Sequence, residues 1–304
     1  MLEVSEAVLG VVLATVGALA FAAQFLCIRL GTDGGNVTEA VFVVLLCNVA
    51  LAGLPTLVLY SSPYSALFTP VSFAAFAAAG VAGMFVARLL MFESIQAIGA
   101  NLTSPVIASN VLFATVFAIV LLEESLTAVH FAGIVLIIGG LTVVSWETAA
   151  TTDPGQSIRE TGTTLFVPLV AAVFIGAEPI FVSIGLAEGT AILPGLTVMA
   201  TTATLGFVGY LVVTRSLHQI GIRSGSTGWY VGGGISTTVG FLSYFAALEF
   251  APVVVVIPLL QLTPLLVVVL SLLFLPARLE RVNWRVGTSA LVVVVGATVV
   301  SLSG

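Results

Sequence analysis

The stretch MFESIQAIGANLTSP, residues 91–105, aligns without a gap on YFAALEFAPVVVVIP, residues 244–258. The two segments lie 153 residues apart, and the alignment places Pro105 on Pro258. Further pairs of segments match in the same order, 21–25 with 175–179 and 130–145 with 283–301. We therefore predict an internal duplication, in which the second half of the chain repeats the first.

The composition indicates that this duplication lies in a membrane. Of the 304 residues, 59% are hydrophobic and only 7% are charged, whereas about 25% of the residues of a soluble domain are charged. No aqueous fold can cover so many apolar residues, so we expect an integral membrane protein. Ten apolar stretches have spanning length: 7–29, 38–60, 71–96, 101–122, 127–146, 164–186, 192–214, 229–250, 253–275 and 285–302.

These stretches divide evenly between the two copies. We predict a first repeat at 1–147, a polar linker at 148–162 and a second repeat at 163–304. Because five helices are an odd number, the second copy must enter the membrane from the opposite face. The predicted fold is therefore all-α, with ten transmembrane helices in two inverted five-helix repeats, an architecture whose transport sites lie near the midplane.

The arginines predict the orientation. The loops reached after the odd-numbered stretches hold Arg29, Arg159, Arg215, Arg223, Arg278, Arg281 and Arg285. The other face has no arginine and holds Glu3, Glu6, Glu123, Glu124 and Glu188. By the positive-inside rule we expect a multi-pass protein of the cell membrane, with the arginine-rich loops in the cytoplasm and both termini outside.

Several classes of function are disfavoured by the sequence. The chain has no lysine and a net charge of −6, a balance that resembles proteins of salt-adapted organisms, although GC-rich codon usage alone would also favour arginine over lysine. It has no basic patch for a nucleic acid. Cys27 and Cys47 lie in apolar runs, His130 and His218 form no metal motif, and no catalytic signature is present, so we expect neither an enzyme nor a cofactor. The N-terminus has no basic region, which argues against a cleaved signal peptide.

The sequence IGAEPIF, 175–181, places Glu178 and Pro179 in the middle of an apolar run. A carboxylate in hydrocarbon is costly, and burial disfavours its charged form, so Glu178 is a candidate to bind and release a proton. Pro179 removes a helical hydrogen bond and predicts a helix break. The structural alternative is a packed kink whose acid is satisfied by a neighbouring helix.

Arg88 is the only basic residue deep in a predicted span. It needs a partner, for which Glu178, Glu93 at a helix end and a substrate carboxylate are candidates. Gln24, the repeat counterpart of Glu178, keeps the polarity without the charge. Arg88 either binds substrate or gates, or forms a structural ion pair, and Gln24 either lines a cavity or joins two helices by a hydrogen bond.

Further polar residues and helix breakers lie midway along other spans. Asn110, Gln261 and Thr263 are either cavity walls or bonds between helices. The predicted helix breaks or hinges are Pro105, Pro179, Pro258 and Pro264. We expect no metal site among these groups.

The segments 104–140 and 257–300 resemble the ends of the two repeats in the drug/metabolite transporter superfamily, specifically its EamA-type ten-helix members. The first contains the turn EESLT before a glycine-rich last helix, whereas in the second Arg278 stands where Glu124 stands in the first. The resemblance implies a central cavity lined by helices 1, 3, 4, 6, 8 and 9. Glu178 also resembles the membrane-embedded glutamate of small multidrug efflux proteins in this superfamily.

Together these observations predict a secondary active transporter that moves a small polar or zwitterionic metabolite, such as an amino acid, by alternating access. The expected partners are that small molecule, the lipid bilayer and protons, and the protein is a monomer or a homodimer. The sequence leaves both import and export open. A non-transporting membrane scaffold, which predicts a protein-filled centre instead of a polar cavity, is the alternative.

Overall fold

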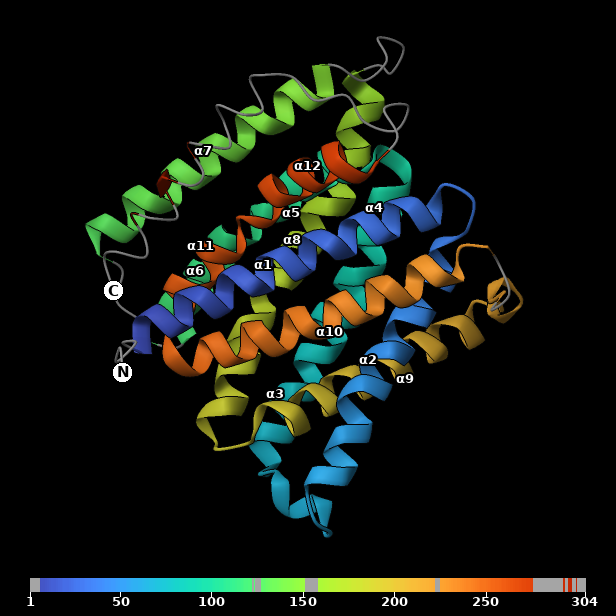
Figure 1. Cartoon of the computed structure of the whole chain (residues 1–304), viewed down its shortest axis with the longest axis vertical. Helices are drawn as coiled ribbons and strands as arrows, with labels where there is room; N and C mark the ends of the chain where they lie inside the picture. Colours follow the sequence, from blue (N-terminus) through green and yellow to red (C-terminus); the bar gives the residue numbers. More distant parts are fainter. Residues whose placement is uncertain are drawn as a thin grey trace.

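The computed structural model describes residues 6–121, 123, 127–150, 158–221 and 225–275, together with 292, 295, 296 and 299 (Figure 1). Most of the predicted span 285–302 lies outside these residues, as do Glu3, Glu124, Arg223, Arg278, Arg281 and Arg285. Every regular element within the described part is a helix. The α-helices are α1 (Glu6–Thr32), α2 (Val37–Leu59), α3 (Pro70–Ala79), α4 (Arg88–Ile98), α5 (Ala100–Ala108), α6 (Asn110–Leu121), α7 (Ala128–Ala150), α8 (Ile158–Ala187), α9 (Ile192–Val213), α10 (Thr227–Phe250), α11 (Val253–Leu260) and α12 (Thr263–Phe274). Short turns of 3₁₀-helix lie at η1 (Tyr64–Leu67) and η3 (Leu217–Gln219), and a π-helical segment, η2 (Gly80–Ala87), joins α3 to α4.

Seven described segments are long and apolar enough to cross a membrane, judged by length and composition. They are Val8–Thr32, Val37–Leu59, Pro70–Ala97, Phe166–Ala187, Ile192–Val213, Thr227–Phe250 and Val255–Phe274. Outward-facing side chains such as Val58 and Val213 are 82% and 83% exposed, as expected for a surface that meets lipid. The described helices therefore form a multi-pass membrane protein.

Two of the predicted continuous spans are broken in the structure. Residues 100–121 form α5 and α6, which meet at Ser109, and residues 253–274 form α11 and α12, which meet at Gln261 and Leu262. The first residues of the paired elements lie 153 positions apart in both cases. The breaks thus occur at equivalent places in the two halves. Helices α7 and α8 extend into the predicted linker, of which residues 151–157 are outside the described part.

Local signals account for several of the helix ends. The Asn36 side chain accepts from the Glu39 backbone N–H at 2.8 Å and begins α2, while Thr69 and Ser72 form a capping box before α3. Gly99, with φ of 84°, separates α4 from α5 in a conformation that favours glycine. Pro252 stands at the equivalent position before α11, where it begins the helix without a backbone donor.

The helices of the two halves pair reciprocally. Helix α1 runs antiparallel to α10, because Gly10 lies against Ala251 and Gly31 against Tyr230 (Figure 1). The equivalent pair, α8 with α3 and η2, is also antiparallel, as Gly185 lies against Phe76 and Gly83 against Glu178. Tyr230 and Phe76 are 154 residues apart, as are Gly31 and Gly185, so the same aromatic-on-glycine contact recurs in both halves.

A second set of pairs is parallel. Helix α2 runs parallel to α10, with a hydrogen bond from Thr227 to Glu39 near one end and one from Asn48 to Thr238 further along. The equivalent pair is α9 with α3 and η2, which run in the same direction. In that pair Phe76 contacts Gly195 and Phe85 contacts Gly206.

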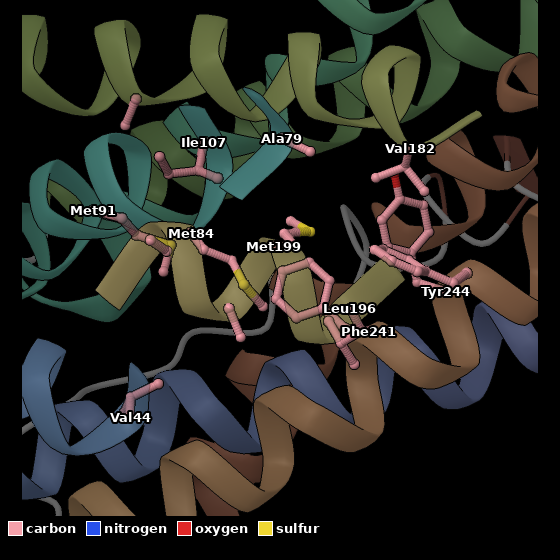
Figure 2. Close-up of a cluster of buried hydrophobic side chains, with 14 of the residues drawn as sticks. Val44, Ala79, Met84, Met91, Ile107, Val182, Leu196, Met199, Phe241 and Tyr244 are labelled. Atoms are coloured by element: carbon pink, nitrogen blue, oxygen red, sulfur yellow. The ribbon is translucent and has the colours of Figure 1, made fainter. Parts of the chain in front are cut away.

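The core lies where these pairs meet. Figure 2 shows side chains from α2, η2, α4, α5, α8, α9 and α10 in one buried cluster, with Phe241 and Tyr244 of α10 lying next to each other. Their ring centroids are 6.2 Å apart. Helix α7 lies at the edge of the bundle and contacts α5 and α11 (Figure 1).

Candidate functional site

A cavity of about 130 Å³ lies between the two halves, large enough for several waters or a small organic molecule. All six polar residues predicted from the sequence line it, together with two of the four predicted prolines. The lining residues are Phe21, Gln24, Phe25, Gly83, Arg88, Met91, Ser104, Ile107, Asn110, Ile175, Glu178, Pro179, Phe241, Tyr244, Ile257, Leu260, Gln261, Thr263 and Pro264. They come from the helices for which the family resemblance implied a central cavity.

The carboxylate of Glu178 projects from α8 toward η2. Glu178 is 6% exposed and lies against Gly83, where any side chain would overlap its carboxylate. Among the described residues, no hydrogen bond reaches the Glu178 carboxylate and no ion pair joins it to Arg88.

The predicted helix breaks only partly coincide with the observed ones. Helix α8 continues through Pro179, so the expected break at that residue was wrong. The proline removes only one backbone N–H donor from a helix of 30 residues. Pro258 lies inside α11 and Pro264 in the first turn of α12, on either side of the break at Gln261. Pro105 lies within α5.

Arg88 begins α4, immediately after the π-helical segment, and is 4% exposed. Its Nη1 donates to Oδ1 of Asn48 at 2.7 Å, and its Cζ lies 5.7 Å from the centroid of the Phe241 ring. The sequence reasoning did not name Asn48, although an amide midway along an apolar span was a usable signal. Glu93, one of the predicted partners, is exposed.

The polar residues at the two helix breaks join the halves. Asn110 is the first residue of α6, and its Oδ1 accepts from Nε2 of Gln261 at 3.1 Å. Thr263 donates to the Leu260 carbonyl at 2.7 Å and lies 3.3 Å from the Ala18 carbonyl of α1. These three residues form bonds between helices and also line the cavity.

Three buried polar groups in the lining have no hydrogen-bond partner within the described part of the chain. They are Nε2 of Gln24 and the hydroxyls of Ser104 and Tyr244, and each residue is at most 3% exposed. Ser104 and Tyr244 were missed by sequence reasoning, since a hydroxyl in an apolar run is usually satisfied by its own helix. A buried unpaired donor is costly, so these groups favour a cavity occupied by water or a polar ligand.

Comparison with known proteins assigns the architecture. The model of the EamA-like transporter family matches the chain twice, at residues 8–146 and 162–302. The chain belongs to the EamA-like transporter family. It is thus a multi-pass protein of a family of membrane transporters, within the drug/metabolite transporter superfamily, and the two matches lie on either side of the polar linker.

Solved structures share the fold of this EamA-like chain. Twenty-eight chains of solved structures match it. One, titled only "Crystal structure of protein", superposes with a TM-score of 0.74 over 97% of this chain and 96% of its own. At 16% sequence identity that likeness shows the fold alone. No curated protein sequence matches the chain.

Proposed function

We propose that this EamA-like protein is a secondary active transporter that moves a small polar or zwitterionic metabolite by alternating access. The observation that carries the proposal is the cavity between the two halves. It holds one acid, Glu178, and one base, Arg88, which form no ion pair with each other among the described residues. An acid and a base that line one cavity without bonding to each other suit a ligand that carries both charges, such as an amino acid.

Glu178 is proposed as the group that couples transport to protons. Its carboxylate lines the cavity and accepts no hydrogen bond within the described part of the chain, so no hydrogen bond holds it in one protonation state. Loss or gain of one proton there changes the net charge of the cavity by one unit. Proton binding and substrate binding would thereby influence each other through the same side chain.

We propose ten transmembrane helices in two inverted repeats as the frame for this mechanism. The antiparallel pairing of α1 with α10 supports inversion, because the first and third helices of a single repeat run parallel to each other. If both repeats entered from the same face, α1 and α10 would be parallel. Equivalent contacts recur in the two halves. Such halves can exchange their conformations, as a carrier that alternates between two related states requires.

The proposed orientation places the arginine-rich loops in the cytoplasm of a cell and both termini outside. Support comes from the contact between the α1–α2 and α9–α10 connections, where Asn36 Nδ2 donates to the Gln219 carbonyl at 3.2 Å. Arg29 and Arg215 therefore belong to one end of the bundle, while Thr69 donates to Glu188 at the other end. The proposal includes the plasma membrane as location and a monomer or homodimer as the functional unit.

Uptake into proteoliposomes tests the proposal. Wild-type protein, E178Q and the control E249Q, which changes an exposed acid, are screened with an amino-acid library under an imposed pH gradient. We expect gradient-driven uptake of at least one zwitterion by wild type and E249Q, and its loss in folded E178Q. If E178Q retains gradient-driven uptake, the proposed role of Glu178 is refuted. If wild type shows no uptake with the pH gradient imposed in either direction, the proposed transport is refuted.

The alternative of a non-transporting scaffold finds less support. A scaffold predicts a centre filled by packed side chains, with Glu178 and Arg88 bonded to each other. The cavity between the two halves and the Arg88–Asn48 bond do not suit that arrangement.

A further inference from the structure

Asn48 forms a buried hydrogen-bond network at the crossing of α2, α4 and α10. It is fully buried, and its Oδ1 accepts from Arg88 at 2.7 Å. Its Nδ2 donates to Oγ1 of Thr238 at 2.8 Å and to the Gly234 carbonyl at 3.2 Å. All polar atoms of the Asn48 amide are therefore engaged.

The chemistry of these partners fixes the orientation of the amide. A backbone carbonyl can only accept, so the Asn48 nitrogen must face Gly234 and the oxygen must face Arg88. The Thr238 hydroxyl donates its own hydrogen to the same Gly234 carbonyl at 2.9 Å and keeps a lone pair for Asn48. Close approach of the helices makes this possible, because any side chain at Gly234 would overlap Cys47 of α2.

The network holds the guanidinium through a neutral amide, and the Glu178 carboxylate in the same cavity forms no ion pair with it within the described part of the chain. An arginine buried in a protein is usually paired with a carboxylate, and the negative charge of that carboxylate balances the positive charge of the guanidinium. Here one N–H of Arg88 is used by a neutral amide, and the ring of Phe241 lies 5.7 Å from Cζ. Because Arg88 lines the cavity, the positive charge of its guanidinium faces a ligand bound there.

We propose that Asn48 is a positioning residue, which orients Arg88 and keeps its charge available for an oxyanion of the substrate. The inference rests on the proposed function of the cavity and narrows its substrate class to compounds with a carboxylate or similar oxyanion. A guanidinium binds such a group through two parallel N–H bonds, which requires a defined orientation. A neutral residue at position 48 is essential to this role.

Equilibrium binding to purified protein tests the inference without a membrane gradient. The probes are benzoate, its neutral isostere benzamide and the cation benzylamine, which share one ring and differ in charge. The variants are N48D, which places a carboxylate beside Arg88, and N48A, which removes the hydrogen bond. The control T56V removes the 2.8 Å hydroxyl bond from α2 to Thr197, away from Arg88.

We expect wild type and T56V to bind benzoate more tightly than benzamide. In N48D and N48A the affinity for benzoate falls about tenfold, the effect of losing a charge-assisted interaction, while the affinity for benzylamine is retained. On an R88Q background N48A has no further effect on benzoate. N48A remains informative if N48D does not fold, since it introduces no charge.

Three results would overturn the inference. They are an unchanged preference for benzoate in N48A, an equal loss of benzoate and benzylamine binding, and a wild type that does not distinguish benzoate from benzamide. The binding experiment is separate from transport. Benzoate selectivity that depends on Asn48, combined with no flux in proteoliposomes, would refute the carrier function and leave the role of Asn48 intact.

Discussion

The carboxylate of Glu178 on α8 occupies the space that Gly83 leaves open in the π-helical segment of the facing helix. A methyl group at position 83 would overlap that carboxylate. The position of the one acidic group in the cavity lining therefore depends on the absence of a side chain on another helix. This relationship gives the first of four predictions.

G83A is expected to displace Glu178 and to abolish gradient-driven uptake. Overpacking of a filled site costs about 1–3 kcal/mol, so the unfolding temperature in detergent should fall as well. The matched control is G209A, because nothing lies within 4 Å of a side chain at Gly209. We expect G209A to transport normally. Equal activity of G83A and wild type would contradict this prediction and would show that the Glu178 carboxylate functions in another position.

The Asn110–Gln261 hydrogen bond is expected to contribute to stability across the two halves. Q261M and N110L should each lower the free energy of unfolding by about 1 kcal/mol, the range of buried bonds between membrane helices. The double variant should cost less than the sum of the single changes, because both remove the same bond. Thermal unfolding of the four proteins in one detergent gives the comparison. Strict additivity would contradict the coupling.

Tyr244 should affect binding and stability in opposite directions. Its hydroxyl is buried and has no partner among the described residues, so Y244F removes a desolvated group with no bond to lose. We expect Y244F to unfold at the same temperature as wild type or higher, and to bind the transported substrate more weakly. A less stable Y244F would indicate an internal partner for the hydroxyl.

Gly31 is expected to be intolerant of any side chain, because a methyl group there would overlap the ring of Tyr230. G31A should destabilise the protein by about 1–3 kcal/mol. Gly34, three residues later, has open space around it, so G34A is the control and should be nearly neutral. Comparable destabilisation by both variants would contradict the role assigned to the Tyr230 contact.

The helices and the polar lining were predictable because hydrophobicity and internal repetition are recorded in the chain directly. Glu178 and Arg88 stood out, since charged residues are costly in hydrocarbon and are kept for a reason. The helix breaks at Ser109 and Gln261 were not predicted as such, because proline and polar residues indicate weak points without fixing where the hydrogen bonds end. Pro179 shows the converse, a strong breaker inside a helix that packing keeps continuous.

The partner of Arg88 could not be deduced from sequence. Asn48 lies 40 residues earlier on another helix, and only the packing of α2 against α4 brings it to the guanidinium. The π-helical segment was also missed, since residues 80–87 carry no proline, and glycines such as Gly80 and Gly83 are frequent in ordinary membrane helices. Both features depend on which helices lie together, a property that periodicity along one segment does not contain.

The π-helical segment determines the directions in which Gly83 and Arg88 project around their common helix axis. In an uninterrupted α-helix two residues five positions apart project about 140° from each other. Hydrogen bonds from i to i+5 instead bring such residues to the same side of the axis. Because of these wider turns, Gly83, which leaves space for the acid, and Arg88, which carries the positive charge, face the same cavity. A return to α-helical winding would turn the two residues away from each other.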